Sequence, residues 1–192
     1  AILGQFDGER ITMRELHRFE NNYVEMNGVF YWDTPYLYNQ LKKGLMAFKQ
    51  GGYGDLDSFG IDTWGVDVVP IAEDGSILSM PRAYRDPYTV GMPEKYFEKI
   101  SKEVVYDKTG IQIMNFNTLY QIYASMETGY VPMKEAKYLL FMPDALAYML
   151  TGEKVCEYTI SSTSQILDPR TKDFDKELLE AAGVDASVFS KP

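Results

Sequence analysis

Apolar and polar positions alternate at the start of the chain, a spacing typical of strands with one buried face. Between two such runs lies the dipeptide Asp7-Gly8, and Asp-Gly between apolar stretches is a strong hairpin signal. Residues 1–19 are therefore predicted to form two strands joined by a tight turn. The asparagine-rich residues 20–31 are predicted to form a polar loop that turns at Gly28.

Helical spacing begins at residue 34. Thr34 can cap a helix, Pro35 suits its first turn, and Gly51 and Gly52 can end it. One buried stripe is expected on this helix, made of Leu37, Leu41, Leu45 and Phe48. The same period and similar terminal signals predict further helices over residues 93–108, 117–128, 143–152 and 173–182.

Strands are expected between these helices. Residues 57–71 read as two short strands around a glycine-containing bend, with a turn following at Asp74-Gly75. Residues 138–142 are almost entirely apolar and are predicted to form a buried strand. Because strands and helices alternate, the predicted fold class is α/β with a mixed sheet and flanking helices. No repeat and no linker divides residues 1–192, so one domain is expected.

Composition and charge exclude several function classes. Hydrophobic residues make up 45% of the chain and charged residues 24%, which is typical of a folded globular protein. Nineteen basic residues against 28 acidic ones give a net charge of −9, which disfavours nucleic acid as a partner. No apolar stretch of about 18 residues is present, so no membrane span is expected. The single cysteine, Cys156, excludes an internal disulfide and favours a reducing, cytoplasmic location.

The common catalytic motifs are also missing. There is no glycine-rich phosphate loop and no Gly-x-Ser-x-Gly turn. A serine hydrolase site would have to use His17, the only histidine, which is expected to be a half-exposed sheet residue. One cysteine and one histidine do not complete a zinc site, and no cation beside Cys156 marks it as a reactive thiolate.

The densest polar cluster is Asp62, Thr63, Trp64, Gly65 and Asp67. Carboxylates and hydroxyls bind sugar hydroxyls, an aromatic face covers the C–H side of a sugar ring, and glycine allows close approach. This mixture favours a carbohydrate site. The alternative is a strand in which Trp64 belongs to the core and the aspartates cap turns.

Three further clusters each have a functional and a structural interpretation. Tyr84-Arg85-Asp86 offers a bidentate polar group or a surface ion pair. Asn117, in the Asn115–Thr118 cluster, is either a site residue or the cap of a helix. Asp144 follows Pro143 and is either functional or a favourable charge at a helix N-terminus.

Together these clusters resemble the N-terminal part of a carbohydrate kinase of the FGGY type, in order and spacing along nearly the whole chain. The resemblance is closest to those members that phosphorylate L-rhamnulose, and the segment Asp62–Asp67 separates them from glycerol, xylulose and fuculose kinases. The segments that carry it are Gly60–Asp67, Pro81–Asp86, Thr109–Gln112, Phe116–Gln121, Leu140–Asp144, Leu150–Gly152 and Glu157–Thr159.

The resemblance implies two ribonuclease-H-like lobes of the actin and hexokinase superfamily, with the sugar and ATP in the cleft between them. Residues 1–192 would be most of the sugar-binding lobe, truncated at both ends and lacking its first strand. The catalytic aspartate is expected beyond Pro192, and ATP, Mg²⁺ and the second lobe are likewise expected to lie with residues outside this chain. Gly65 is expected to present backbone groups to the sugar, and the other expected sugar-site residues are Trp64, Thr63, Asp62, Arg85, Asp86, Phe116 and Asn117.

Other functions remain open at this point. One alternative is that the chain is part of a kinase for another ketose, such as L-fuculose or xylulose. Another is that it is a non-catalytic carbohydrate-binding lobe. A ribonuclease-H-like nuclease is disfavoured by the charge of −9. If a strand is missing, the neighbouring sheet edges are unpaired, and self-association through an edge is expected.

Overall fold

The structure is a computed structural model that describes all residues, 1–192. Its α-helices are α1 Thr34–Gln50, α2 Met92–Tyr96, α3 Lys102–Thr109, α4 Thr118–Glu127, α5 Val131–Lys134, α6 Met142–Thr151, α7 Tyr158–Ser161 and α8 Lys176–Ala182. Its strands are β1 Ile2–Phe6, β2 Ile11–Glu15, β3 Tyr23–Met26, β4 Val29–Trp32, β5 Val68–Ile71, β6 Tyr138–Phe141, β7 Leu167–Asp168 and β8 Asp173–Phe174. Two short 3₁₀ helices are η1 Pro87–Thr89 and η2 Ala186–Val188. No helix is both long and apolar enough to cross a bilayer.

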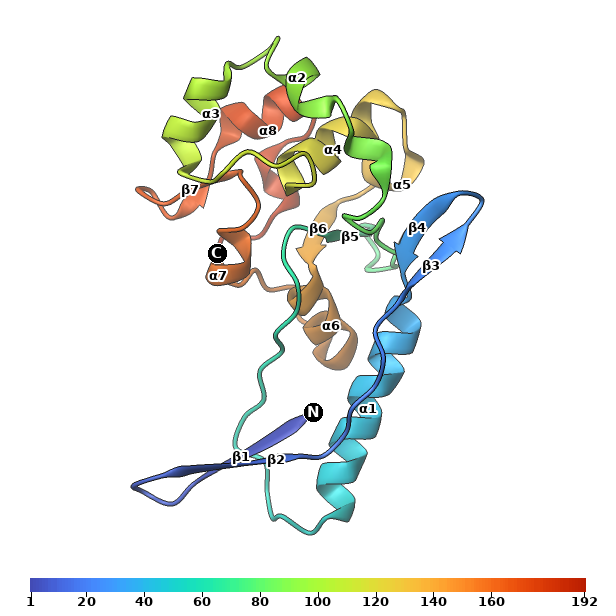
Figure 1. The fold of residues 1–192 in the computed structure, drawn as a ribbon, viewed down its shortest axis with the longest axis vertical. Coiled ribbons are helices and arrows are strands. Elements are labelled where there is room, and N and C mark those ends of the chain that lie inside the picture. The colour runs from blue at the N-terminus through green and yellow to red at the C-terminus, as the bar shows by residue number, and fades with distance from the viewer.

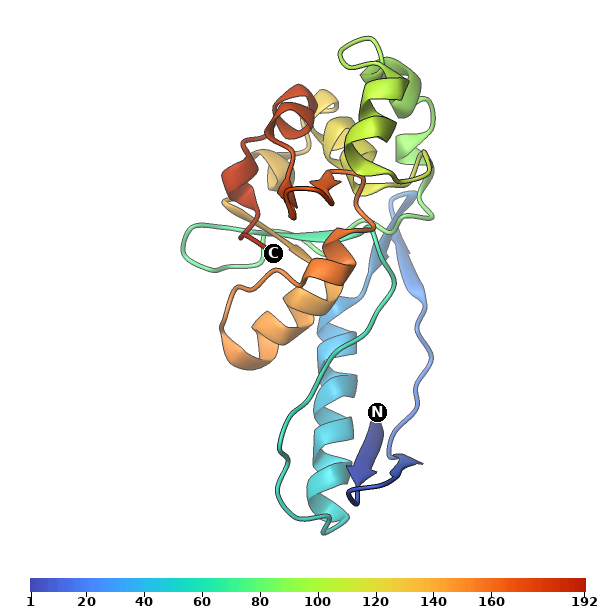
Figure 2. The same cartoon turned by 90° about the vertical axis from the view of Figure 1, so that its left-hand side faces the viewer.

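The antiparallel pair β5–β6 lies at the centre of the fold (Figure 1). Because side chains alternate along a strand, its two faces belong to different cores. Val68, Leu139 and Phe141 belong to the larger core, which contains residues of α2, α3, α4 and α8. Val69, Ile71 and Leu140 belong to a smaller core with residues of α1 and α6. The result is three layers, with helices on both faces of the strand pair (Figures 1 and 2).

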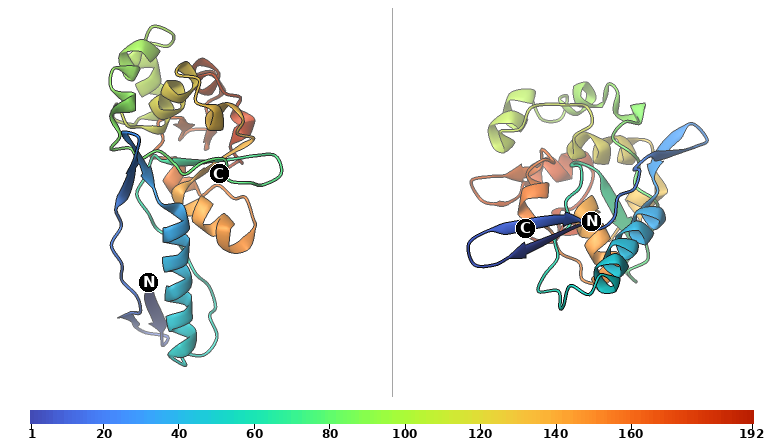
Figure 3. Two further views of the ribbon diagram at one scale, coloured as in Figure 1. Left: turned by 90° about the vertical axis from the view of Figure 1, so that its right-hand side faces the viewer. Right: turned by 60° about the horizontal axis from the view of Figure 1, so that its bottom comes forward.

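Two hairpins extend from this body. The predicted hairpin at Asp7-Gly8 is confirmed as β1–β2, which lies beside the C-terminal part of α1 (Figure 3). Only one of its strand residues, Leu3, is buried, and the outer edges of both strands pair with nothing. Self-association through these edges stays a prediction.

The loop predicted for residues 20–31 is wrong, because most of it forms the hairpin β3–β4. Asn27 has a φ of 53° and Gly28 a φ of 75°, the left-handed conformations that a two-residue hairpin turn requires. The Asn-Gly dipeptide is a hairpin signal that outweighs its polar surroundings. Phe30, Tyr31 and Trp32 form most of β4 and are therefore strand residues.

The helix predictions hold with two exceptions. The helix predicted for residues 173–182 begins only at Lys176, because Asp173–Phe174 form β8 and Asp175 caps α8. The first helix is confirmed as α1, although its cap is Asp33, whose carboxylate accepts a hydrogen bond from the Tyr36 N–H at 2.9 Å. The single helix predicted for residues 93–108 is instead two helices, α2 and α3. Ser101 interrupts it, because its hydroxyl caps the N-terminus of α3.

The first strand predicted within residues 57–71 is not formed. Residues 53–67 run without regular structure alongside α1, and only the second strand appears, as β5 (Figure 2). A strand needs a neighbour to bond its backbone N–H and C=O groups, and no strand of this chain pairs with residues 57–65. Every pair that does form is antiparallel, so the mixed sheet expected from the sequence is not seen among these strands.

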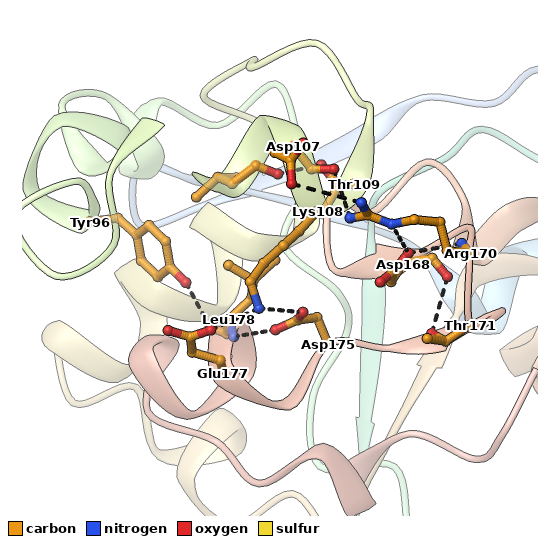
Figure 4. A network of polar contacts seen from close by, with 11 residues as sticks. Tyr96, Asp107, Lys108, Thr109, Asp168, Arg170, Thr171, Asp175, Glu177 and Leu178 are labelled. Carbon is orange, nitrogen blue, oxygen red and sulfur yellow. Dashed lines mark hydrogen bonds and ion pairs between the residues drawn. The ribbon is translucent and has the colours of Figure 1, made fainter. Parts of the chain in front are cut away.

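A polar network ties α3 to the C-terminal part of the chain (Figure 4). The Lys108 ammonium lies 2.7 Å from Asp175 and 2.8 Å from Glu177. The Asp175 side chain is only 12% exposed, and it also accepts a hydrogen bond from the Leu178 N–H to cap α8. Arg170 adds a second link, to Asp168 and to the backbone of Asp107.

Replacing Lys108 by methionine is expected to lower the free energy of unfolding by about 1–2 kcal/mol. The substitution leaves the mostly buried Asp175 carboxylate without its cation. The matched control is Lys137→Met, because Lys137 and Glu73 form an exposed pair at 3.8 Å that is expected to contribute less than about 0.5 kcal/mol. Chemical unfolding of the two variants and of the wild type measures both changes in the free energy of unfolding. Equal effects would contradict a stabilising role for the network.

Candidate functional site

The centre of the candidate site is a tight turn, Gly65–Asp67, directly before β5. The Asp67 N–H donates to the Gly65 carbonyl at 3.0 Å, which closes a three-residue turn. Its central residue, Val66, has a φ of 68°. A β-branched residue rarely adopts a positive φ, and such a conformation persists only when the surroundings impose it, at a cost of about 1–3 kcal/mol.

Distant parts of the chain hold this turn in place. The Val66 carbonyl accepts hydrogen bonds from the Thr118 hydroxyl at 2.7 Å and from the Gln121 side-chain amide at 3.3 Å, both at the start of α4. The Val66 N–H donates to the Thr163 hydroxyl at 3.3 Å. The strained backbone is therefore fixed from two sides by side chains that lie 52 to 97 residues further along the chain.

The Asp67 carboxylate is the hub of the site. It is 1% exposed and accepts four hydrogen bonds from nitrogen donors. One oxygen accepts from the indole N–H of Trp32 at 2.5 Å, from the indole N–H of Trp64 at 2.9 Å and from the backbone N–H of Tyr84 at 3.2 Å. The other accepts from Gln121 at 2.8 Å.

No cation neutralises Asp67, and its pKa shows the effect. Burial raises the pKa of this carboxyl to about 6, although the hydrogen bonds from Gln121, Trp32, Trp64 and Tyr84 each lower it. The four donors keep the carboxylate in place, while the loss of water makes its charge costly.

Four aromatic rings form a continuous row beside this hub. The Trp32 and Trp64 rings are 4.2 Å apart between centroids, Trp32 and Tyr84 are 6.2 Å apart, and Tyr84 and Phe116 are 5.6 Å apart. Trp32 is buried, whereas the other three are only partly buried. The row therefore offers an aromatic surface to a ligand, and hydrogen bonds to Asp67 hold its two indole rings in place.

One polar backbone group remains free next to this surface. The N–H of Gly65 donates to no acceptor in the protein, and Gly65 is only partly buried. A Cβ atom at this position would lie 2.8 Å from the Thr163 hydroxyl oxygen, so only glycine fits without a shift. An unpaired donor beside aromatic rings is what a sugar site needs, since the ring stacks and the hydroxyls form hydrogen bonds.

A hollow of about 400 Å³ is lined in part by Trp64. Asp62 and Thr63 line it together with apolar residues of α1 and α6, and six of its nine lining residues are hydrophobic. Gly65, Tyr84 and Phe116 are not among them. The hollow and the aromatic row are therefore two separate features that meet at Trp64.

The structure brings some of the expected site residues together and gives others a structural role. Trp64 and Gly65 are adjacent to Asp67, and Phe116 reaches the row through Tyr84. Arg85 is exposed, with its guanidinium carbon 5.0 Å from the Tyr84 ring centroid. It forms no ion pair with Asp86, so the surface ion pair considered from the sequence is not formed.

Asp86 and Asn117 stabilise the fold around the site. The buried Asp86 carboxylate accepts from the Phe30 N–H at 2.8 Å and from the Tyr88 N–H at 2.9 Å, which fastens the β3–β4 hairpin and caps η1. The Asn117 amide donates to the Gln112 carbonyl and to Gln165, both at 2.9 Å. Asn117 occupies the cap position of α4 without capping it through its side chain.

Sequence reasoning missed four residues of the site: Trp32, Tyr84 as a ring of the row, Gln121 and Thr163. Trp32 carries only a weak signal, as part of an aromatic run. Tyr84 and Gln121 lie in segments that the sequence singles out, but nothing local reveals their contacts with the Gly65–Asp67 turn, which span 17 and 54 residues. Thr163, whose contact spans 97 residues, carries no local signal. In the structure, Asp67 connects Trp32, Tyr84 and Gln121, and Val66 connects Gln121 with Thr163.

The two residues considered for nucleophilic catalysis have other roles. The His17 ring nitrogen lies 2.7 Å from the Gln40 side-chain oxygen, in an irregular segment after β2 rather than in a strand. Cys156 is partly buried, as expected, and burial raises the pKa of its thiol to about 12, which disfavours the reactive thiolate. Asp144 accepts from the Glu157 N–H at 3.2 Å, and burial raises its pKa to about 6.

Pro192 is not a residue of this site. It lies in the irregular segment that follows η2, and it lines neither the hollow beside Trp64 nor the aromatic row. The two strongly buried carboxylates of the site region, Asp67 and Asp86, are both engaged by backbone or side-chain donors of the fold. The catalytic aspartate expected beyond Pro192 therefore stays a prediction about residues outside this chain.

Comparison with known proteins identifies a family and close relatives. Residues 16–191 match the N-terminal domain of the FGGY family of carbohydrate kinases. The rhamnulokinase of Bacteroides thetaiotaomicron is 46% identical over 191 residues, which cover 100% of this chain and 39% of that protein. The rhamnulokinase of Halalkalibacterium halodurans is 40% identical over 190 residues, covering 99% of this chain and 40% of that protein. The chain thus spans about two-fifths of the length of these relatives.

Solved structures share the fold at low sequence identity. A gluconate kinase from Lactobacillus acidophilus superposes with a TM-score of 0.81 at 14% identity, over 95% of this chain and 36% of that one. A ligand-bound xylulose kinase from the same organism gives a TM-score of 0.80 at 14% identity, over the same shares. The chain thus shares the fold of these kinases, and the α/β fold expected from the sequence is confirmed.

Replacing Asp67 by asparagine is expected to change how stability depends on pH. An unfolded aspartate has a pKa of about 3.9, and the folded value is about 6. Because the folded state binds the Asp67 proton more tightly than the unfolded state, this proton stabilises the fold below about pH 4. That contribution to the free energy of unfolding is lost as the pH rises through about 6. Between about pH 4.5 and about pH 7.5, the free energy of unfolding of the wild-type chain should therefore fall by up to about 2 kcal/mol relative to that of Asp67→Asn.

Unfolding free energies of both proteins at the two pH values measure this difference. Asp144 titrates in both proteins and cancels from the comparison. The asparagine variant should also be less stable at about pH 4.5, because its amide group faces the Gln121 amide donor. A pH-independent difference between the two proteins would show that Asp67 does not titrate in this range.

Proposed function

This chain belongs to the FGGY family of carbohydrate kinases, and we propose that the intact protein of which it is part phosphorylates L-rhamnulose to L-rhamnulose 1-phosphate in rhamnose catabolism. The observation that carries the proposal is 46% identity to a rhamnulokinase across the whole chain. The γ-phosphoryl group of ATP would pass to the hydroxyl on the first carbon of the ketose, with release of ADP. The hydroxyl proton would go to the aspartate expected beyond Pro192.

The part played by this chain is to bind and position the sugar. The Gly65 N–H, free of any protein acceptor, would bind a sugar oxygen. The Trp64, Tyr84 and Phe116 rings would cover the apolar side of the sugar. Asp62, Thr63 and Arg85 are proposed as neighbours of the sugar with smaller roles. Positioning supplies much of the rate advantage of a kinase, since little covalent chemistry is left for the protein.

We assign neither the nucleotide nor Mg²⁺ to the residues of this chain. No group of three or more carboxylate, histidine or cysteine side chains is placed to hold a metal ion, and no glycine-rich phosphate loop is present. ATP and Mg²⁺ would therefore be bound chiefly by the rest of the intact protein. We place the reaction in the cytoplasm, in keeping with the unpaired thiol of Cys156.

A ketose panel tests the proposal. The intact protein is expected to phosphorylate L-rhamnulose with a kcat/KM at least about tenfold above those for L-fuculose and D-xylulose, since one altered contact in a sugar site is worth about 1–3 kcal/mol. The 192-residue chain alone, assayed in parallel, is expected to show no turnover. A preference for another ketose would reassign the substrate, and an inactive intact protein that still binds sugar would favour a non-catalytic lobe. Turnover by the isolated chain would contradict the proposal that ATP binding and catalysis need residues outside it.

A further inference from the structure

We propose that Thr163 is a positioning residue for sugar binding, acting by holding the Gly65–Asp67 turn in its strained conformation. This inference rests on the proposed function, because it concerns the same sugar site. Thr163 follows α7 and is 97 residues from Val66 in sequence, and neither composition nor motif singles it out. Two independent features of the structure point to it.

The first feature is the close approach of Thr163 to Gly65. An added Cβ at residue 65 would lie 2.8 Å from the Thr163 hydroxyl oxygen, 3.1 Å from its Cβ and 3.2 Å from its methyl carbon. The threonine side chain thus occupies the space that a side chain at residue 65 would need. This contact is the reason that the turn requires glycine at the residue whose N–H is free for a ligand.

The second feature is the hydrogen-bond geometry of the Thr163 hydroxyl. The hydroxyl donates its proton to the Ile160 carbonyl at 2.8 Å, which orients the oxygen. That oxygen then accepts from the Val66 N–H at 3.3 Å. A hydroxyl has one proton and two lone pairs, so both bonds form at once.

Together these two bonds fix the direction of the Val66 N–H, which no other group in the protein does. Thr118 and Gln121 bind the Val66 carbonyl, and only Thr163 binds the Val66 N–H. Without it, only the Asp67 N–H, bonded to the Gly65 carbonyl, still restrains the peptide between Gly65 and Val66 from rotating toward a relaxed φ at Val66. The Gly65 N–H and the Trp64 ring would then lose the fixed direction that a preorganised site requires.

The test compares three variants of the intact protein. Thr163→Val keeps the shape of the side chain and removes both hydrogen bonds, whereas Thr163→Ser keeps the hydroxyl. The matched control is Thr159→Val in the same segment, because the exposed Thr159 hydroxyl bonds only to Glu157 and does not contact the turn. One hydrogen bond is worth about 0.5–1.5 kcal/mol, which corresponds to a change of about 2- to 12-fold in affinity.

Thr163→Val is expected to raise the KM for L-rhamnulose by about 5- to 10-fold with kcat within about 2-fold of wild type. Thr163→Ser and Thr159→Val should stay within about 2-fold of wild type in both constants. Near-ultraviolet circular dichroism, which reports on Trp32 and Trp64 alongside the tyrosines, should change for Thr163→Val and not for Thr159→Val. If Thr163→Val does not fold, Thr163→Ala is measured in its place, with the same expectation.

Several results would overturn the proposal. One is a folded Thr163→Val with an unchanged KM for L-rhamnulose. Another is a rise in KM for Thr163→Ser as large as that for Thr163→Val, which would assign the effect to packing rather than to the hydroxyl. If wild type accepts a different ketose, the proposed substrate fails, and the same variants are compared on that ketose. If wild type accepts none, the proposed function fails, and the dichroism comparison alone decides whether Thr163 holds the turn.

Discussion

The hydrogen bonds to the buried Asp67 carboxylate are the interaction on which the rest of the site depends. They join four segments that are far apart in sequence: the β3–β4 hairpin through Trp32, the Asp62–Asp67 segment through Trp64, the stretch after β5 through Tyr84, and α4 through Gln121. A buried carboxylate without a cation is costly unless donors surround it. Because each donor comes from a different segment, satisfying the charge also fixes the positions of the rings.

The strained turn and the carboxylate support each other. Val66 adopts its positive φ because its N–H and C=O are held by Thr163, Thr118 and Gln121. That conformation places Asp67 where Gln121 also reaches it, so one amide side chain serves both groups. The strain is confined to the residue after Gly65, whose N–H is left for a ligand. Packing around the β5–β6 pair keeps the distant supports at fixed distances.

The sequence alone predicts the parts of the fold that local chemistry determines. Pro35 and the paired glycines mark α1, and the apolar period with Gly129 and Gly152 marks α4 and α6. The β3–β4 hairpin is signalled by Asn27-Gly28, yet its polar surroundings favour a loop. Residues 57–65 have strand-like composition without a strand partner in this chain, and composition does not reveal a partner. Of the site, Trp64, Gly65 and Phe116 are expected from the sequence. The contact of Gln121 with Asp67 and the whole role of Thr163 emerge only from the structure, because these contacts join residues 54 and 97 positions apart.

The most direct test of this account is amide hydrogen exchange at Gly65 in the intact protein, with and without L-rhamnulose. The Gly65 N–H has no acceptor in the protein, so it should exchange rapidly without sugar. Saturating L-rhamnulose is expected to slow this exchange markedly, while the exposed amides of the β1–β2 turn stay unchanged. Unaltered exchange at Gly65 under saturating sugar would contradict the claim that this turn binds the substrate.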